Sequence, residues 1–299
     1  TLAQAEDAPE LVKCAMQDAE AAGDAVRTLE ALSERAANAV IDALQGVRLE
    51  LASAPLARLV ARLRGQDALG QLQAGLTSAS PEVRRSCLAA LGQLADPSSV
   101  DRIAFAMADE DEGVRIAAID SLGRVGSERA ADALLHALGA DSLAVRSRAI
   151  RALARMGESR ALPHLVPFVT GPAIVAMEAI EALARLHAPN LADQVHAALG
   201  HEDPDVVQRA LTVAQGLDDS DQVDHLVRGL QHPSWHVRST AARILGALDL
   251  REAHAALEAH ASHEQDPHVQ EALRTAVRAK REAVEPASPA EPTEEPTGG

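Results

Sequence analysis

Four stretches of the chain decide its fold: PEVRRSCLAALGQL at residues 81–94, EGVRIAAIDSLGRV at 112–125, LAVRSRAIRALARM at 143–156 and WHVRSTAARILGAL at 235–248. Each has apolar residues at the three- and four-residue spacing of a helix that buries one face. The first three begin 31 residues apart, and the fourth keeps the same register. Self-similarity at this period indicates stacked repeats that share one continuous core.

Three apolar columns run in phase through the chain, with steps of 30 or 31 residues. They are Val83, Val114, Val145, Val175, Val206 and Val237; Val60, Leu91, Leu122, Leu153, Leu183, Ala214 and Leu245; and Leu72, Ile103, Leu134, Leu165, Val195, Leu226 and Leu257. The first two columns belong to one helix of each repeat and the third to a second helix. The pattern predicts an all-α chain, a right-handed α-solenoid of about seven helical hairpins.

Helix starts are marked by a capping residue followed by proline, because the cap accepts a free N–H group and proline needs none there. The sites are Ser80-Pro81, Asp96-Pro97, Asp203-Pro204 and Asp266-Pro267. Gly126 and Gly157 fall between the two helices of their repeats.

These signals predict seven repeats over residues 48–265, at 48–79, 80–110, 111–141, 142–171, 172–202, 203–233 and 234–265. Residues 1–47 are predicted to form an N-terminal helical hairpin cap, with helices at 9–22 and 24–46, and residues 266–283 a C-terminal capping helix. Residues 284–299, VEPASPAEPTEEPTGG, are rich in proline and glutamate and lack core-forming residues, so we expect a disordered acidic tail.

The four opening stretches resemble the short HEAT-like repeats of the phycobilisome-lyase type, over about residues 50 to 275. The resemblance is specific for fold. It says little about function, because the motif residues are those that pack the helices.

Composition narrows the function classes. The 28 basic and 44 acidic residues give a net charge of −16, which argues against nucleic-acid and membrane partners, since both bind through excess Lys and Arg. Two cysteines form no disulfide framework, and we see no signal peptide and no apolar run of 18 residues. The sequence therefore predicts a cytoplasmic, bacterial protein.

The resemblance also implies two enzymatic alternatives. Bilin lyases handle an open-chain tetrapyrrole, but Phe105, Phe168 and Trp235 are scattered and tyrosine is absent. Di-iron deoxyhypusine hydroxylases carry His-Glu pairs inside the first helix of a repeat. Here the pairs His201-Glu202 and His263-Glu264 fall in turns between repeats. We expect no catalytic residues and no cofactor, and an enzyme or lyase- or chaperone-like protein for a tetrapyrrole or metal stays the alternative.

Metal binding has one candidate cluster. His201, His232 and His263 recur one repeat apart, which is too far for a shared ion because packed helices lie about 8–10 Å apart. His260, His263 and His268 are closer in sequence. We predict no metal site, with that cluster left open.

Charged residues recur on the second helices, which we expect to line the concave side. Acidic positions flanked by Arg and His predict a docking groove for a basic protein segment, formed by Asp101, Arg102, Asp132, His164, Asp193, Asp224 and His225. The alternative is a solvated helix face. The sequence thus predicts a protein–protein scaffold or adaptor that is not an enzyme.

Arginines on the first helices have structural interpretations. The Val-Arg column of Arg84, Arg115, Arg146 and Arg238 is expected to pair with acidic turn residues such as Asp111 and Asp141. Asp120, Arg151 and Glu181 share a register, as do Arg148 and Glu178, and we expect lateral ion pairs between repeats.

Overall fold

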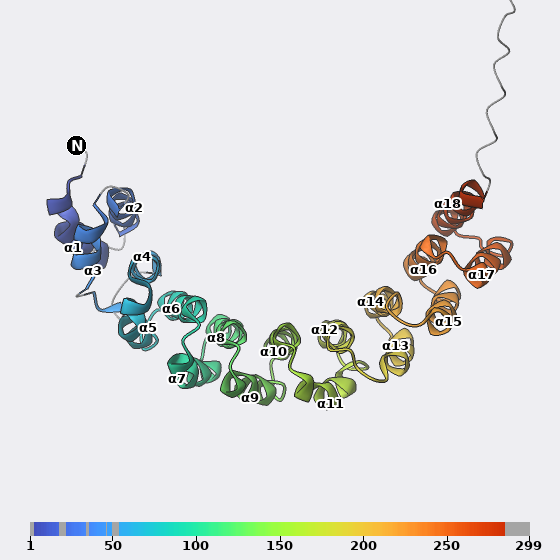
Figure 1. Ribbon diagram of the computed structural model, residues 1–299, viewed down its shortest axis with the longest axis horizontal. Coiled ribbons are helices and arrows are strands. Elements are labelled where there is room, and N and C mark those ends of the chain that lie inside the picture. Colours follow the sequence, from blue (N-terminus) through green and yellow to red (C-terminus); the bar gives the residue numbers. More distant parts are fainter. Residues whose placement is uncertain (1–2, 18–21, 34–35, 46, 50–53, 285–299) are drawn as a thin grey trace, which may run out of the picture. The chain divides into compact units, whose positions relative to one another are not determined.

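The computed structural model describes residues 3–17, 22–33, 36–45, 47–49 and 54–284, and within these ranges it contains helices and no β-strand (Figure 1). The all-α α-solenoid is confirmed. The chain divides into two compact units, Thr1–Leu165 and Val166–Gly299, a division that the repeat pattern did not predict.

The first unit holds the N-terminal helices and four hairpins. The N-terminal helices are α1 (Ala8–Gln17), α2 (Ala22–Ser33) and α3 (Ala37–Leu44). The hairpins are α4 (Ala54–Arg64) with α5 (Leu69–Gly75), α6 (Pro81–Leu94) with α7 (Val100–Phe105), α8 (Glu112–Val125) with α9 (Glu128–Ala137), and α10 (Leu143–Met156) with α11 (Leu162–Leu165). The predicted two-helix cap is wrong, because the backbone of Ala36 is not helical and the expected second helix is divided into α2 and α3.

The second unit holds three hairpins and a closing helix. They are α12 (Ala173–Arg185) with α13 (Leu191–Leu199), α14 (Pro204–Ala214) with α15 (Asp219–Leu230), α16 (Trp235–Ala247) with α17 (Arg251–Ala261), and α18 (Pro267–Val284). Each hairpin of the described chain lies inside one predicted repeat. The predicted tail lies, after Val284, outside the described residues.

Every member of the three apolar columns is buried, and the whole third column, from Leu72 to Leu257, has no exposed surface. Cys87 is also fully buried, as expected for a position that holds alanine in the other repeats, and burial raises the pKa of its thiol to about 12. The repeat period thus predicted the core correctly.

Helices or turns begin at the predicted sites, but the side chain of Ser80 makes no capping hydrogen bond, so capping is confirmed only for the three aspartates. Asp203 accepts from the backbone N–H of Asp205 at 2.9 Å, and Asp266 from that of His268 at 2.9 Å. Asp96 caps a 3₁₀ turn, Pro97–Ser99, that leads into α7. Gly126 and Gly157 end α8 and α10 with φ of +67° and +73°, a conformation that glycine adopts without a steric penalty.

Consecutive first helices touch through small residues. A Cβ atom on Gly92 of α6 would lie 2.8 Å from the Cα of Ser121 in α8, and one on Gly123 would lie 3.0 Å from the Cβ of Ala152 in α10. In the second unit, a Cβ on Gly246 of α16 would lie 2.9 Å from the Cα of Ala276 in α18. Helix backbones at these points are as close as the side chains allow.

This contact bends the first unit. Figure 1 shows the first helices of this unit, α4, α6, α8 and α10, in a row on the inner side of its bend, with the second helices α5, α7, α9 and α11 on the outer side. A stack curves toward the row whose helices lie closer together, so the small residues determine which helices face inward.

We predict that Gly92→Ala destabilises the protein by about 1 kcal/mol, within a net range of about 0–2 kcal/mol. Overpacking against the α8 backbone costs about 1–3 kcal/mol, and the better helix propensity of alanine returns about 1 kcal/mol. Chemical denaturation followed by circular dichroism measures the change. Gly70→Ala in α5 is the matched control, because its new methyl group meets nothing within 4 Å. Equal stability of the two variants would contradict the close-contact interpretation.

Candidate interaction surface

The predicted acidic residues of the first unit lie on its second helices, and they are already paired. Both carboxylate oxygens of Asp101 in α7 accept hydrogen bonds from Arg129 Nη2, at 2.7 and 2.9 Å. Asp132 in α9 accepts from Arg160 Nη1 at 2.8 Å. The four side chains are exposed, so these pairs contribute little to stability. Arg160 also donates to Glu158, so one guanidinium group there serves two carboxylates. The pairs connect neighbouring repeats and reduce the acidic charge available to a partner.

The remaining predicted residues are placed differently from one another. Arg102 and His164 of the first unit are exposed, and so are Asp193 in α13 and Asp224 in α15 of the second unit. His225 is only 8 % exposed, and its ring meets that of His196 edge-on with centroids 5.9 Å apart. Its Nδ1 faces the carbonyl oxygen of Asp221. The prediction that His225 lies on a docking surface is therefore wrong.

The expected concave position of the second helices is also wrong for the first unit. Because the close contacts at Gly92 and Gly123 bring the first helices together, the row that carries Asp101 and Asp132 lies on the outer side of the bend. The partner-binding role of the predicted aspartates stays a prediction, but it belongs to an outer face.

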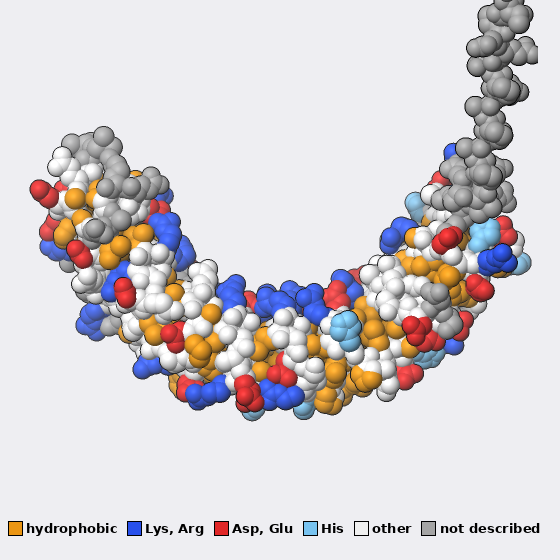
Figure 2. Space-filling model, viewed as in Figure 1, with side chains coloured by type: hydrophobic (Ala, Val, Ile, Leu, Met, Phe, Trp, Pro, Cys, Tyr) orange, Lys and Arg blue, Asp and Glu red, His pale blue; other side chains and the backbone are white. Residues whose placement is uncertain are grey.

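The inner face of this unit is basic instead. We call it the first-helix face. It consists of exposed and half-buried side chains of α4, α6, α8 and α10. Their positions follow Pro55, Arg58 or Arg62 by multiples of 31 residues, or lie beside such positions on the helix surface. The four helices contribute seven arginines and two carboxylates to it, an excess of five positive charges, of which Glu30 and Asp111 from neighbouring segments offset two. The residues are Arg58, Arg62, Arg85, Arg124, Arg148, Arg151 and Arg155, with Glu82 and Asp120. Figure 2 shows basic side chains along the edge that α6, α8 and α10 form.

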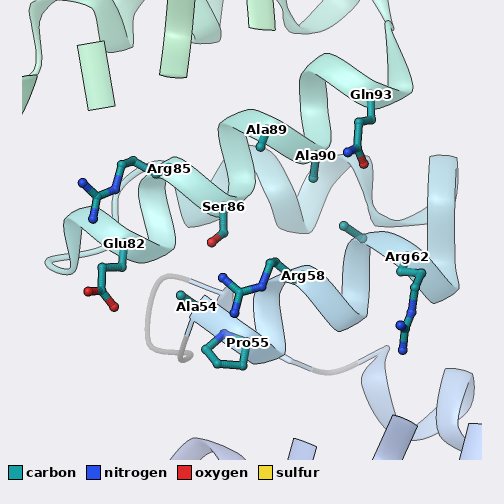
Figure 3. A pocket seen from close by; sticks show the side chains of 11 residues that line it. Ala54, Pro55, Arg58, Arg62, Glu82, Arg85, Ser86, Ala89, Ala90 and Gln93 are labelled. Carbon is teal, nitrogen blue, oxygen red and sulfur yellow. The ribbon is translucent and has the colours of Figure 1, made fainter. Parts of the chain in front are cut away.

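A hollow of about 650 Å³ opens on this face between α4 and α6 (Figure 3). Alanines of both helices, Ala61 and Ala89 among them, line it and leave room that larger side chains would fill. Arg58 extends from α4 toward Ser86 of α6, and Glu82 lies at the end of α6 near the start of α4. The hollow therefore offers a cationic group above a floor of small side chains.

Some of these arginines lie near carboxylates of neighbouring segments. Arg62 Nη2 lies 3.2 Å from Glu30 Oε1, an exposed pair, and Arg85 Nη1 lies 3.7 Å from Asp111 Oδ1. Arg58 has no ion-pair partner in the part of the chain that the structure describes.

Asp120 faces two arginines of α10. Its oxygens lie 3.5 Å from Arg148 Nη1 and 3.7 Å from Arg155 Nη2. Lateral pairing between repeats is thus confirmed for Asp120, through two arginines that the register had not paired with it. One carboxylate shared by two guanidinium groups leaves the surface positive.

Two members of the Val-Arg column, Arg84 and Arg238, pair with acidic turn residues as predicted, whereas Arg146 reaches only the backbone carbonyl of Asp141, at 3.5 Å. Arg84 is buried, and its Nε and Nη2 donate to Asp109 at 2.8 and 2.7 Å while its Nη1 donates to the carbonyl of Ser78 at 2.8 Å. Arg115 donates to the carbonyl of Asp109 at 2.8 Å. The expected partner, Asp111, instead caps α8 through the N–H of Val114 at 2.9 Å.

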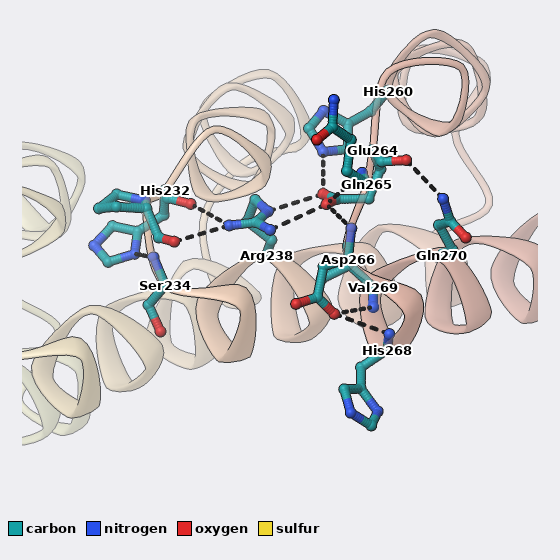
Figure 4. A network of polar contacts seen from close by, with 11 residues as sticks. His232, Ser234, Arg238, His260, Glu264, Gln265, Asp266, His268, Val269 and Gln270 are labelled. Carbon is teal, nitrogen blue, oxygen red and sulfur yellow. Dashed lines mark hydrogen bonds and ion pairs between the residues drawn. The ribbon is translucent and has the colours of Figure 1, made fainter.

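Arg238 repeats this arrangement in the second unit (Figure 4). It donates to both oxygens of Glu264, at 2.8 and 3.0 Å, and to the carbonyls of His232 and Pro233. Hydrogen bonds from Arg238 hold the pKa of Glu264 down at about 2, and those from the Asp266 N–H and His260 add to the effect. Arg84 and Arg238 thus connect the turn before their own helix with the turns that lead into α8 and α18, respectively.

Two histidines of the candidate metal cluster contact other side chains. His260 Nε2 lies 3.1 Å from Glu264 Oε2, and the ring of His268 stacks on Trp235 at a centroid distance of 4.7 Å. Within the described ranges, no group of three or more His, Cys, Asp or Glu side chains is arranged to hold a metal ion. Each of these two imidazoles has a structural neighbour instead.

We predict a pH-dependent effect of Glu264→Gln. A carboxyl group whose pKa is lowered on folding from 4.5 to about 2 stabilises the protein above pH 4.5, and this contribution is lost as the pH falls toward 2. The variant should lose on the order of 2–3 kcal/mol at pH 7 relative to the parent, and the difference should shrink between pH 4.5 and 2.

Chemical denaturation at pH 7, 4 and 3 measures this difference. Glu271→Gln is the control, because Glu271 is 70 % exposed in its pair with Arg274 and should change stability by less than about 0.5 kcal/mol. If Glu264→Gln lost the same free energy of unfolding at every pH, the interaction with Arg238 would not require the carboxylate charge, and the prediction would be wrong.

Comparisons with known proteins agree with this architecture. A family model described as HEAT repeats matches residues 69–144, 101–184 and 192–278. A search of curated proteins gave no match. None of the described helices has both the length and the apolar character needed to cross a membrane.

Solved structures are similar in fold. The chain is 12% identical to Kap95p in its complex with RanGDP, with a TM-score of 0.60 over 91% of this chain and 46% of that one. It is 19% identical to a chain of the CpcE–CpcF complex of phycocyanin lyase from Nostoc sp., with a TM-score of 0.45 over 71% and 94%. It is 18% identical to human deoxyhypusine hydroxylase, with a TM-score of 0.36 over 84% and 99%.

Proposed function

Because the chain belongs to the HEAT-repeat family, we propose that it is a non-enzymatic scaffold whose first-helix face binds an acidic segment of another protein. The observation that carries this proposal is the excess of positive charge on one face of a chain whose net charge is −16. Protein partners are supported in general by Kap95p, which is seen in a complex with RanGDP.

The chemistry of the face favours carboxylates. Guanidinium groups bind carboxylates through two parallel hydrogen bonds, and Arg58 is free to do so. The hollow beside it lets a partner backbone approach α4 and α6 without a clash with large side chains. With only three aromatic residues in the chain to act as anchors, we expect binding of moderate affinity that is steered by charge.

A protein segment fits better than a nucleic acid because the basic surface is short. In the second unit, the same registers carry three arginines, Arg185, Arg209 and Arg243, and three carboxylates, Glu178, Glu181 and Asp205. A long polyanion would meet no excess of positive charge there and would be repelled by the acidic remainder of the chain.

We predict that the triple substitution Arg58→Glu, Arg62→Glu and Arg85→Glu weakens binding of an acidic peptide at least tenfold. The probe is a fluorescein-labelled decapeptide of alternating glutamate and alanine, and fluorescence anisotropy at 50 and 300 mM NaCl measures its affinity. Binding by the parent protein should weaken with salt, because exposed charges are screened. Circular dichroism should stay unchanged, since the three side chains are exposed or half-buried.

The matched control is Lys13→Glu, Arg228→Glu and Arg251→Glu, which changes the net charge equally at exposed positions outside α4, α6, α8 and α10. It should leave the affinity within about twofold. Equal losses in both triple variants would refute the first-helix face, and tighter binding of a single-stranded RNA decamer than of the peptide would refute a protein ligand. Stoichiometric iron or zinc, or a visible chromophore in the purified protein, would favour the enzymatic alternative.

A further inference from the structure

Phe105, at the end of α7, is an unusual surface residue. Its side chain is 85 % exposed, the largest fraction among the exposed large hydrophobic residues of the described chain. In the other repeats, the position two residues after the third apolar column holds Ala74, His136, Pro167, Ala197, Arg228 and Ala259. The fold therefore does not need a large apolar group here, and a solvated phenyl ring has no role in the core.

A hollow of about 310 Å³ lies beside this ring. It is lined by the C-terminal end of α5 and by α7 with the 3₁₀ turn Ala106–Ala108 that follows. Leu76, Ala106 and Ala108 give it an apolar lining next to Phe105. An exposed aromatic residue beside a small apolar hollow is the usual composition of a binding hot spot.

The polar groups around the hollow are almost all occupied. Asp101 is held by Arg129, and Asp109 by the buried Arg84. Thr77 donates to the carbonyl of Ala74 at 2.9 Å, and Gln73 donates to Ser99 at 3.2 Å.

Arg102 is the exception. It is exposed, and it has no hydrogen bond or ion pair with any residue that the structure describes. The hollow therefore combines apolar surface with one unpaired positive charge. A partner segment that matches this hollow has an apolar side chain next to a carboxylate.

We propose that the hollow beside Phe105 is a second docking site, which takes a short partner segment with an apolar side chain next to a carboxylate. The apolar side chain enters the hollow against Phe105, and the carboxylate pairs with Arg102. Two residues of the predicted docking surface, Asp101 and Arg102, line this site, but Asp101 serves it only through its pair with Arg129. The site is separate from the first-helix face, since second helices form it.

Fluorine NMR tests the proposal directly. The chain has two phenylalanines, Phe105 and Phe168, so protein labelled with 4-fluorophenylalanine should give two resonances, which Phe105→Leu assigns. The probe is an acetylated heptapeptide with one leucine between two glutamates in a glycine–serine background. Its two controls replace the glutamates by lysine or the leucine by serine. We expect the first peptide alone to shift the Phe105 resonance while that of the half-buried Phe168 stays in place.

Two variants test the assigned roles. Both variants are made in the Arg58/Arg62/Arg85→Glu background, in which the first-helix face no longer binds acidic segments, and the leucine–glutamate peptide carries fluorescein in place of the acetyl group. Arg102→Gln should then weaken its binding about fivefold, and Phe105→Ser should abolish measurable binding in anisotropy, while circular dichroism stays unchanged because both side chains are exposed. No shift of the Phe105 resonance at millimolar peptide, or an equal shift with the lysine peptide, would overturn the proposal. The Arg58/Arg62/Arg85→Glu protein should show the same shift, so the proposals for this site and for the first-helix face can be refuted independently of each other.

Discussion

Contact between consecutive first helices through glycine and other small residues is the constraint on which the rest of the first unit depends. Gly92 lies against Ser121 and Gly123 against Ala152, so α6, α8 and α10 approach more closely than larger side chains would permit. The row then becomes the inner side of the bend, and whatever projects from it faces inward. Arginines project from it, and the aspartates of the second helices consequently face outward.

A second set of contacts fixes the register of the repeats. Arg84 and Arg238 each donate to carbonyls of the turn before their own helix and to a carboxylate in the turn that ends their own repeat. Such charge-assisted, bidentate bonds are directional, whereas the aliphatic core is not. The apolar columns therefore hold the helices together, and the buried arginines determine how each hairpin meets its neighbour.

Much of the fold was predictable because buried positions recur with the repeat period. Leu72, Ile103 and Leu134 could be assigned to the core from their spacing, and Asp203-Pro204 to a helix start from its chemistry. Periodicity states which positions are buried, but it does not state which row of helices is more tightly spaced. That information lies in Gly92 and Gly123, which the columns of large residues do not include. The inner face was for this reason assigned to the wrong helices.

The candidate site was hidden by averaging of charge over the whole chain. The net charge of −16 does not reveal that Arg58, Arg148 and Arg155 lie on one face. The 31-residue period places them there, in three neighbouring columns. His225 was assigned to the surface because equivalent positions of the repeats were assumed to have equal exposure. Arg102 is exposed, but His225, at the equivalent position in the second unit, is buried against His196. Detailed pairing, such as Asp109 in place of Asp111 for Arg84, depends on turn geometry that the spacing of residues does not encode.

The burial of Cys87 gives the first unit a built-in reporter of its own opening. Its sulfur lies under Gly75 of α5, where there is no space even for a methyl group, and a thiol with a pKa of about 12 does not react at neutral pH. Alkylation therefore requires that α5 separates from α6. The labelling rate at Cys87, followed separately from that at the half-buried Cys14, then measures the free energy of that one separation with no substitution in the protein.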